Sequence, residues 1–126
     1  MADAKTKKEI FEHLLELEDV MIHLDPRRKG AVLPKRFRRK SHLLLHIGKV
    51  MPIPIPDLEV TDLGIGATLS FNRKPFHCFL PWASIYAVVG KDSSRGMIWS
   101  EDLPKEVEAA FHVQGFNPPQ GPGVLN

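Results

Sequence analysis

The sequence has little of several features that mark large classes of proteins. It contains a single cysteine, Cys78, so no disulfide can form within the chain. No apolar run approaches the roughly 18–20 residues that a membrane-spanning helix needs. The opening residues MADAKTKKEI lack the apolar stretch of a signal peptide. These absences argue against a disulfide-stabilised or helical membrane protein, and we expect a soluble protein of a reducing cytoplasm.

Sequence patterns typical of enzymes are also missing. The chain has no glycine-rich phosphate loop, no serine-centred elbow and no Asp/Glu pair at a predicted strand end. Cys78 follows His77, but adjacent residues of a strand point to opposite faces, so we interpret Cys78 as a buried apolar residue. On a strand, His42 and His46 would lie about 13 Å apart, too far to share a metal ion. We therefore expect neither an enzyme nor a cofactor.

What is present suffices for one small domain with a cationic face. The chain has 126 residues, of which 43% are hydrophobic, and this size is typical of a single core. Its formal charge of +2 conceals a local excess of cations. These crowd one segment, at Arg27, Arg28, Lys29, Lys35, Arg36, Arg38, Arg39 and Lys40. Because the rest of the chain is net acidic, this basic segment predicts a distinct surface.

Local patterns predict one helix followed by β-structure. Thr6 and Glu9 fit a capping box, and apolar residues from Ile10 to Leu17 then recur at helical spacing. Short β-branched or aromatic runs follow, separated by Gly, Pro and charged turns. They predict strands over 20–24, 31–35, 42–47, 58–60, 67–71, 77–80, 84–88 and 96–99. The expected fold is mainly β with one N-terminal α-helix, a small sheet or barrel in a single domain.

Turns, connectors and the C-terminal segment carry their own signals. FNRKPF predicts a tight hairpin. MPIPIPD predicts an extended connector or a sheet edge, because its prolines cannot donate to a ladder. We expect Trp82, Tyr86 and Trp99 to close the core. After Phe111 the chain becomes rich in Gly and Pro with almost no charge, which predicts a domain over 1–111 and a flexible tail over 112–126.

The basic segment is the strongest chemical signal, and it has three interpretations. It can be an ordinary solvated loop. It can hold RNA or single-stranded DNA through phosphate contacts and stacking on Phe37 or Phe71. It can also line a groove for acidic peptides, where cations raise the association rate and help to select the partner.

The order of these segments resembles the stringent starvation protein B family, adaptors that deliver tagged substrates to the ClpXP protease. The resemblance covers residues 8–104 and rests on order and spacing. VMIHLDPRRKGAVLPKRF is similar to the segment after the family's first helix, and LLLHIG and ATLSFN are similar to two of its strands. LPWASIYAVVGKDSSRGMIWSED resembles the most recognisable block of the family.

This resemblance implies a helix packed on a small, strongly bent (Sm-like) β-structure, paired through that helix as a homodimer in the bacterial cytoplasm. Each subunit would bind an extended ssrA-type degradation tag in a groove, and a C-terminal tail would dock on the ClpX unfoldase. The resemblance places peptide binding at Phe37, Leu45, Ile47, Phe71, Asn72, Lys74 and Phe76, the dimer contact at Phe11, Leu14 and Leu15, and unfoldase docking at Val124 and Leu125.

Two departures from the family pattern leave the preferred tag and the docking sequence open. The chain between Phe71 and Pro81 is shorter than in the family and lacks a Gly-Gly stretch. The tail ends in GPGVLN and keeps only the apolar part of the family's docking cluster.

Overall fold

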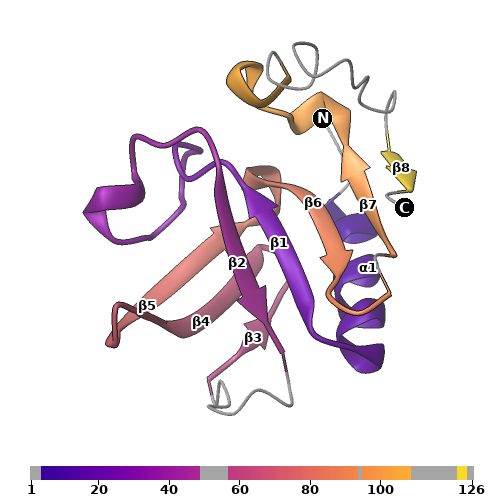
Figure 1. The fold of residues 1–126 in the computed structure, drawn as a ribbon, viewed down its shortest axis with the longest axis horizontal. Coiled ribbons are helices and arrows are strands. Elements are labelled where there is room, and N and C mark those ends of the chain that lie inside the picture. The colour runs from indigo at the N-terminus through magenta and orange to yellow at the C-terminus, as the bar shows by residue number, and fades with distance from the viewer. Residues whose placement is uncertain (1–3, 49–56, 94, 109–121, 125–126) are drawn as a thin grey trace.

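The computed structural model describes residues 4–48, 57–93, 95–108 and 122–124 (Figure 1). Helix α1 (Ala4–Leu17) precedes two antiparallel sheets, with strand orders β2-β1-β6-β7-β8 and β3-β4-β5. The strands are β1 (Val20–Leu24), β2 (Leu43–Ile47), β3 (Glu59–Val60), β4 (Gly64–Phe71), β5 (Lys74–Pro81), β6 (Ile85–Gly90), β7 (Gly96–Trp99) and β8 (Pro122–Val124). Short 3₁₀ turns are η1 (Lys35–Phe37), η2 (Trp82–Ser84) and η3 (Ser100–Asp102). The mainly β fold with an N-terminal helix is confirmed, and the described strands form open sheets without closing into a barrel.

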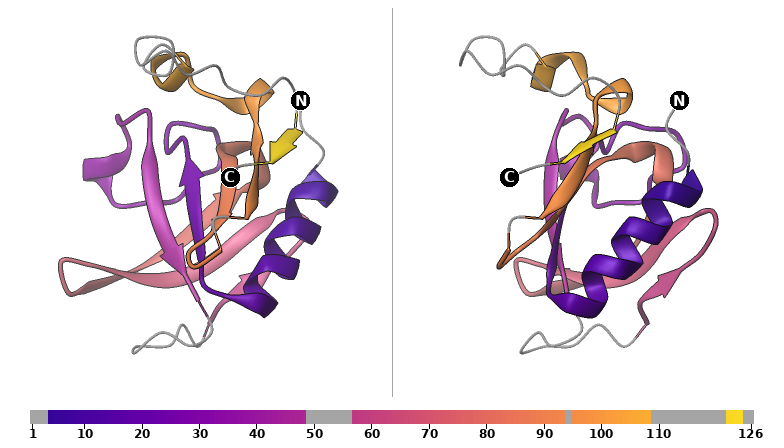
Figure 2. Two further views of the ribbon diagram at one scale, coloured as in Figure 1. Left: turned by 45° about the vertical axis from the view of Figure 1, so that its right-hand side comes forward. Right: turned by 90° about the vertical axis from the view of Figure 1, so that its right-hand side faces the viewer.

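One hydrophobic core joins helix α1 to both sheets. Alternation along β1 buries Val20, Ile22 and Leu24 on one face of the first sheet. Helix α1 lies along this sheet, as Figure 2 shows, and packs Phe11 into the same core. The β4–β5 hairpin contributes Ile65, Ala67, Leu69, Cys78 and Leu80. Burying these apolar side chains is the main favourable term for the fold.

The three large aromatic residues expected in the core are buried. Trp82 is 2% exposed, Tyr86 2% and Trp99 0%. The indole Nε1 of Trp82 donates a hydrogen bond to the Thr61 carbonyl at 2.9 Å. Tyr86 belongs to a second, smaller cluster on the other face of the first sheet, with Ala87, Ile98 and Leu103. The first sheet therefore buries apolar residues on both faces.

Most predicted strands are found, but the one over Ala31–Lys35 is wrong. Val32 makes only an isolated bridge with Phe79 on β5. Pro34 has no backbone N–H for a ladder, and the chain after it tightens into η1, where Phe37 N–H donates to the Pro34 carbonyl at 3.0 Å. Strands β4 and β5 are longer than predicted because they pair along their whole length, from Gly64↔Pro81 to Phe71↔Lys74.

Three other expectations, on the helix start, the proline-rich connector and the C-terminal tail, have different outcomes. Helix α1 includes Ala4, so it extends upstream of the capping box predicted at Thr6. The proline-rich connector falls mostly on 49–56, outside the described residues. Of the predicted tail, Pro122–Val124 form β8 beside β7, whereas residues 112–121, 125 and 126 lie outside the described part of the chain.

The tight hairpin predicted from FNRKPF is confirmed. Phe71 pairs with Lys74, so only Asn72 and Arg73 form the turn. Both have positive φ, 51° and 67° respectively. A two-residue turn with positive φ at both positions matches the right-handed twist of the flanking strands. In Figure 1 the hairpin extends to the left edge of the molecule, away from α1.

A buried lysine in the first turns of α1 connects the helix to the start of β6 and to η3. The Lys7 ammonium donates to the carbonyls of Trp82 at 2.8 Å and Ile85 at 2.6 Å, and to Asp102 Oδ2 at 2.7 Å. Its side chain is 0% exposed. Burial lowers the pKa of Lys7, while the hydrogen bond and charge of Asp102 raise it.

No helix among the described residues is long and apolar enough to cross a membrane.

Candidate functional site

Aromatic rings and cations from two distant segments meet between η1 and the tip of the β4–β5 hairpin. The rings of Phe37 and Phe71 lie 5.3 Å apart between centroids, tilted by 49°. The Arg36 guanidinium carbon lies 4.7 Å from the Phe37 centroid and 5.9 Å from that of Phe71. Lys40 Nζ lies 5.9 Å from the Phe37 ring. We call Arg36, Phe37, Lys40 and Phe71 the aromatic–cationic cluster.

Local backbone geometry explains why the cations gather around Phe37. Pro34 enters η1 with φ −54° and ψ 143°, a conformation that proline favours. The chain then makes successive tight turns, with Arg38 N–H donating to the Lys35 carbonyl and Lys40 N–H to the Phe37 carbonyl, each at 3.1 Å. These turns bring Arg36 and Lys40, which would lie far apart on an extended chain, to the same Phe37 ring. Arg36 and Lys40 stay exposed, whereas Phe37 is half-buried.

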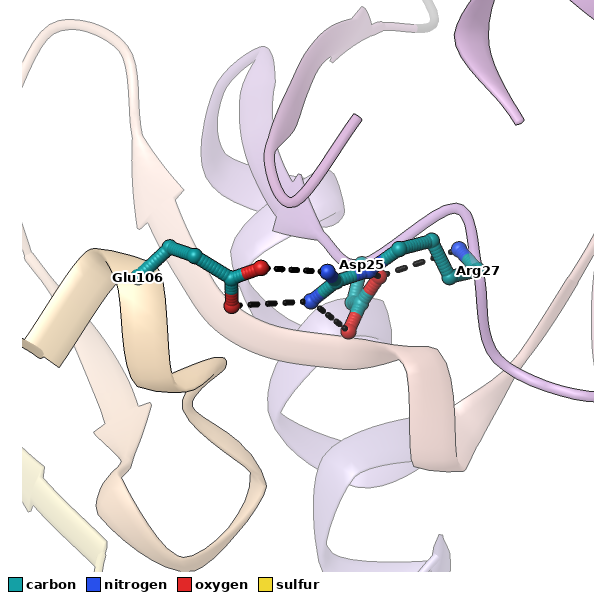
Figure 3. Close-up of polar contacts among 3 residues, drawn as sticks. All are labelled: Asp25, Arg27 and Glu106. Carbon is teal, nitrogen blue, oxygen red and sulfur yellow. Dashed lines mark hydrogen bonds and ion pairs between the residues drawn. The ribbon is translucent and has the colours of Figure 1, made fainter. Parts of the chain in front are cut away.

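The basic segment divides into a paired part and an unpaired part. Figure 3 shows Arg27 between Asp25 and Glu106, with its guanidinium donating to Asp25 at 3.0 Å and to Glu106 at 2.5 and 3.1 Å. The hydrogen bonds of Glu106 and Asp25 raise the pKa of Arg27 further. Arg28 lies 3.7 Å from Asp102.

The cations from Lys35 onward have no such partners among the described residues. No carboxylate in the described part of the chain forms an ion pair with Lys35, Arg36, Arg38, Arg39 or Lys40. The first part of the basic segment thus neutralises charges of the protein itself. The second part has no carboxylate of the described residues within ion-pair distance.

The structure brings together only some of the peptide-binding residues expected from sequence. Phe71 and Phe76 are half-buried and contact the edge of the core, with Phe71 also touching Phe37. Asn72 and Lys74 are exposed at the turn of the same hairpin. The remaining two residues belong to the core proper: Leu45 is 7% exposed and Ile47 0%. Both side chains point from β2 into the main core, and Ile47 has no exposed surface for a ligand.

The other expected site residues lie elsewhere. Phe11, Leu14 and Leu15 are 0%, 4% and 6% exposed, so the chain's own core accounts for their burial. A partner helix would have to contact other residues of α1, such as Leu17, which is 55% exposed. Val124 lies on β8 opposite Met97, and Leu125 is outside the described residues.

An apolar trough lies between α1 and β7, away from the aromatic–cationic cluster. It has a volume of about 370 Å³ and is open to solvent. Its lining is Glu9, Ile10, His13, Leu14, Arg95, Gly96 and Met97, and the surface inside it is apolar. No sequence pattern predicted this trough, because α1 and β7 are far apart along the chain.

A histidine pair was also missed. His23 Nδ1 and His42 Nε2 lie 3.0 Å apart, with the rings stacked at 5.2 Å between centroids. Burial, and then the charge of His42, lower the pKa of His23 to about 4. Both rings flank Tyr86, whose buried hydroxyl has no hydrogen-bond partner among the described atoms. The pairing of β1 with β2 creates this contact, so spacing along the chain could not reveal it.

The remaining chemical groups are separated from one another. His46 Nε2 lies 2.9 Å from Asp19 Oδ2, so His42 and His46 have different neighbours. In the described ranges, no three His, Cys, Asp or Glu side chains lie close enough to hold a metal ion. Cys78 is buried, and burial raises the pKa of its thiol to about 11.

Comparison of the chain with protein-family models and with curated proteins found no match.

Proposed function

We propose that this protein is a non-enzymatic adaptor that binds an extended acidic peptide at the aromatic–cationic cluster. The observation that carries the proposal is that Arg36 and Lys40, which form no ion pair with a described carboxylate, lie next to the rings of Phe37 and Phe71. Acidic side chains of a peptide would pair with Arg36 and Lys40, and apolar ones would pack on the exposed parts of the two rings.

The sheet next to the cluster offers backbone groups to such a peptide. Strand β2 is the last strand of its sheet in the described structure, so its outer edge has unpaired N–H and C=O groups. An extended peptide can add to such an edge, with alternate side chains reaching nearby pockets. Leu43 and Leu44 on β2 are still partly exposed and would meet these side chains.

The resemblance to the stringent starvation protein B family supports the same reading and makes it more specific. On this proposal the peptide is an ssrA-type degradation tag, and the protein delivers tagged substrates to ClpXP in the bacterial cytoplasm as a homodimer paired through α1. Exposed Leu17 would belong to that contact.

Sedimentation of wild type and of Leu17→Glu tests the proposed dimer, since the variant should be monomeric while remaining folded.

A second candidate function is binding of RNA or single-stranded DNA. The observation that favours it is the same guanidinium stacked near two rings, because nucleic acids are also held by cations and aromatic platforms. The two functions differ in salt dependence. A protein that neutralises several phosphates loses affinity steeply as salt rises, whereas a peptide with two or three carboxylates releases few counterions.

The deciding experiment titrates the protein with an ssrA-type peptide and with a short RNA, each at two salt concentrations. We expect weakly salt-dependent peptide binding and at most loose, steeply salt-dependent RNA binding. Phe71→Ala should weaken peptide binding by about 1 kcal/mol or more, as for a partly buried aromatic anchor. Arg36→Ala should weaken it too.

The matched control is Lys29→Ala, an exposed cation of the same segment with no aromatic contact among the described residues. It should bind the peptide as wild type does. If Phe71→Ala and Arg36→Ala stay folded and also bind normally, the cluster is not the site. Nanomolar RNA binding at physiological salt without peptide binding would replace the adaptor with the nucleic-acid function.

A further inference from the structure

Strand β5 has an outer edge that the described part of the chain covers at one residue only. On one side β5 pairs with β4, and it is the last strand of its sheet. On the other side Val32 N–H donates to the Phe79 carbonyl at 2.9 Å, and Phe79 N–H donates to the Val32 carbonyl at 3.1 Å. Pro34 has no N–H to continue this pairing, and its carbonyl accepts from Phe37 instead. Between Phe79 and the hairpin tip, the edge therefore has no strand partner among the described residues.

Two observations show which backbone groups of β5 face this open edge. Along a strand, the N–H and C=O groups of residues two apart point to the same side. Phe79 faces the edge, so His77 and Pro75 face it too. The two-residue turn gives the same result, because Phe71 and Lys74 form the pair that closes it, so Lys74 faces β4 and its neighbour faces outward. His77 thus presents a donor and an acceptor that no other described segment uses in a backbone hydrogen bond.

Side chains beside this edge project from the face that carries the aromatic–cationic cluster. Directly paired residues of antiparallel strands project from one face, so Lys74 projects beside Phe71. Phe76, two residues further on, projects from the same face and is half-buried. A peptide strand on this edge, about 4.8 Å from β5, would set every second side chain beside Lys74 and Phe76, which favour acidic and apolar groups.

We infer that the acidic peptide of the proposed function adds as a strand to the outer edge of β5, with one peptide residue bonded to both the N–H and the C=O of His77. The inference rests on that proposed function and assigns the strand edge and the register. Charge favours a peptide over a second copy of the chain at this edge. The hairpin over 64–81 contains Arg73 and Lys74 but no Asp or Glu, so two hairpins paired edge to edge would bring together like charges.

The first test removes the N–H of His77. The variant His77→Pro should keep the hydrogen bonds between β5 and β4, because this N–H faces away from β4, and Pro75 already stands two residues earlier on the same edge. It should weaken binding of the ssrA-type peptide about two- to tenfold, as expected for the loss of one hydrogen bond. A folded His77→Pro chain that binds as wild type does would overturn the inference.

Two control variants separate the N–H from other effects of the substitution. His77→Ala removes the side chain and keeps the N–H. Ser70→Pro places proline on the opposite edge of the hairpin, since Thr68 N–H donates to Asp57 there at 3.0 Å and Ser70 N–H faces the same way. Both controls should bind the peptide as wild type does. Equal weakening by His77→Ala and His77→Pro would assign the effect to the imidazole and reject the backbone contact.

Amide exchange in the wild-type chain tests the inference without any substitution. The His77 amide should exchange fast in the free chain, and saturating ssrA-type peptide should slow it by about tenfold or more, because a bonded amide exchanges only after opening. Slowed exchange over 43–47 with no change at His77 would place the peptide on β2 and overturn the inference. A His77 amide that is already protected without peptide, and loses protection on dilution, would assign the edge to a second copy.

Failure of this inference differs from failure of the proposed function. Peptide binding that depends on Phe71 and Arg36, but not on the N–H of His77, would keep the cluster as the site and reject the β5 edge. Absence of peptide binding to the wild-type chain would reject both.

Discussion

At the scale of single residues, Lys7 is a charge placed where water cannot reach it. A lysine ammonium has three N–H donors, and the Trp82 carbonyl, the Ile85 carbonyl and Asp102 accept them at 2.6–2.8 Å. Lys7 Nζ also lies 5.5 Å from the Trp99 ring centroid. Satisfying every donor offsets the cost of burying the charge. The pair thus fixes where α1 begins to pack on the sheet.

Removing one member of this pair should cost more than removing both. Lys7→Met leaves Asp102 buried, with Arg28 at 3.7 Å as its one remaining ion-pair partner among the described residues, and should lower the free energy of unfolding by about 3–5 kcal/mol. The double variant Lys7→Met/Asp102→Leu should recover much of that loss, because no unpaired charge remains. Urea unfolding of both single variants and the double variant measures the coupling. Additive losses in the double variant would contradict this account.

His23 should make stability depend on pH in a defined window. Its pKa is about 4 in the folded protein against an ordinary value of 6.5, so between these values the unfolded chain binds a proton that the folded chain does not. Stability should therefore fall as pH is lowered from 6.5 to 4, by up to ~1.4 kcal/mol per pH unit for this one proton. Burial also lowers the pKa of His42 in the same direction.

The variant His23→Gln removes this titration and keeps a polar side chain beside His42. Its free energy of unfolding should change less with pH between 6.5 and 4 than that of wild type. His13→Gln, at an exposed position of α1, serves as the control and should follow wild type. The carboxylates whose pKa is lowered, such as Glu18, contribute equally to all three proteins. Identical slopes for all three would mean that His23 is not buried as neutral imidazole.

At the scale of elements, sequence patterns predicted what depends on neighbouring residues. Period-2 alternation located β1 and period-3.6 alternation located α1, because each buries one face. FNRKPF predicted its turn because turn-forming residues stand between two apolar runs, which is also a property of neighbouring residues. The strand predicted over Ala31–Lys35 was wrong because β-branched Val32 favours a strand, whereas Pro34 has no N–H to donate to a strand ladder. Strand β8, Pro122–Val124, carries Pro and Gly, which are signals against a strand.

What the sequence could not predict depends on contacts between distant segments. Lys7 looked like any exposed lysine, since its partners lie at least 75 positions away. Phe37 and Phe71 were expected in one site, but no local pattern separates them from Leu45 and Ile47, which the sheet pairing buries. Likewise, Arg27 and Arg36 look alike in sequence. Only the fold brings Glu106 to the first and leaves the second unpaired.

The β4–β5 turn offers a test of local strain. Arg73 has φ of 67°, a left-handed conformation that costs a non-glycine residue about 1 kcal/mol. Arg73→Gly should raise the free energy of unfolding by about 0.5–1 kcal/mol, since glycine adopts this conformation freely. The control Ser70→Gly, at an exposed position within β4, should lower it, because glycine weakens a strand. Thermal or urea unfolding distinguishes the two, and a destabilised Arg73→Gly would show that Arg73 makes a stabilising contact.

At the scale of the whole molecule, the two candidate interaction surfaces lie at opposite ends. In Figure 1 the tip of the β4–β5 hairpin is at the left and β7, β8 and α1 are at the right. A peptide at the aromatic–cationic cluster would therefore leave the β7–α1 end free for a second partner. Tethering two partners raises their effective concentration without changing the chemistry of either. This arrangement suits the proposed adaptor.

Delivery of a tagged substrate provides the test at this scale. Adding the protein to ClpXP should lower the apparent KM for an ssrA-tagged substrate, by ~10-fold or more, and should leave kcat unchanged, because tethering only concentrates the substrate. Deleting residues 115–126 should abolish this effect while peptide binding persists, since the deletion removes the proposed docking residues and spares the cluster. Arg36→Ala should reduce delivery for the opposite reason, because it keeps the tail and weakens the hold on the tag. A truncated chain that delivers as well as the full chain would show that unfoldase docking does not use the C-terminal segment.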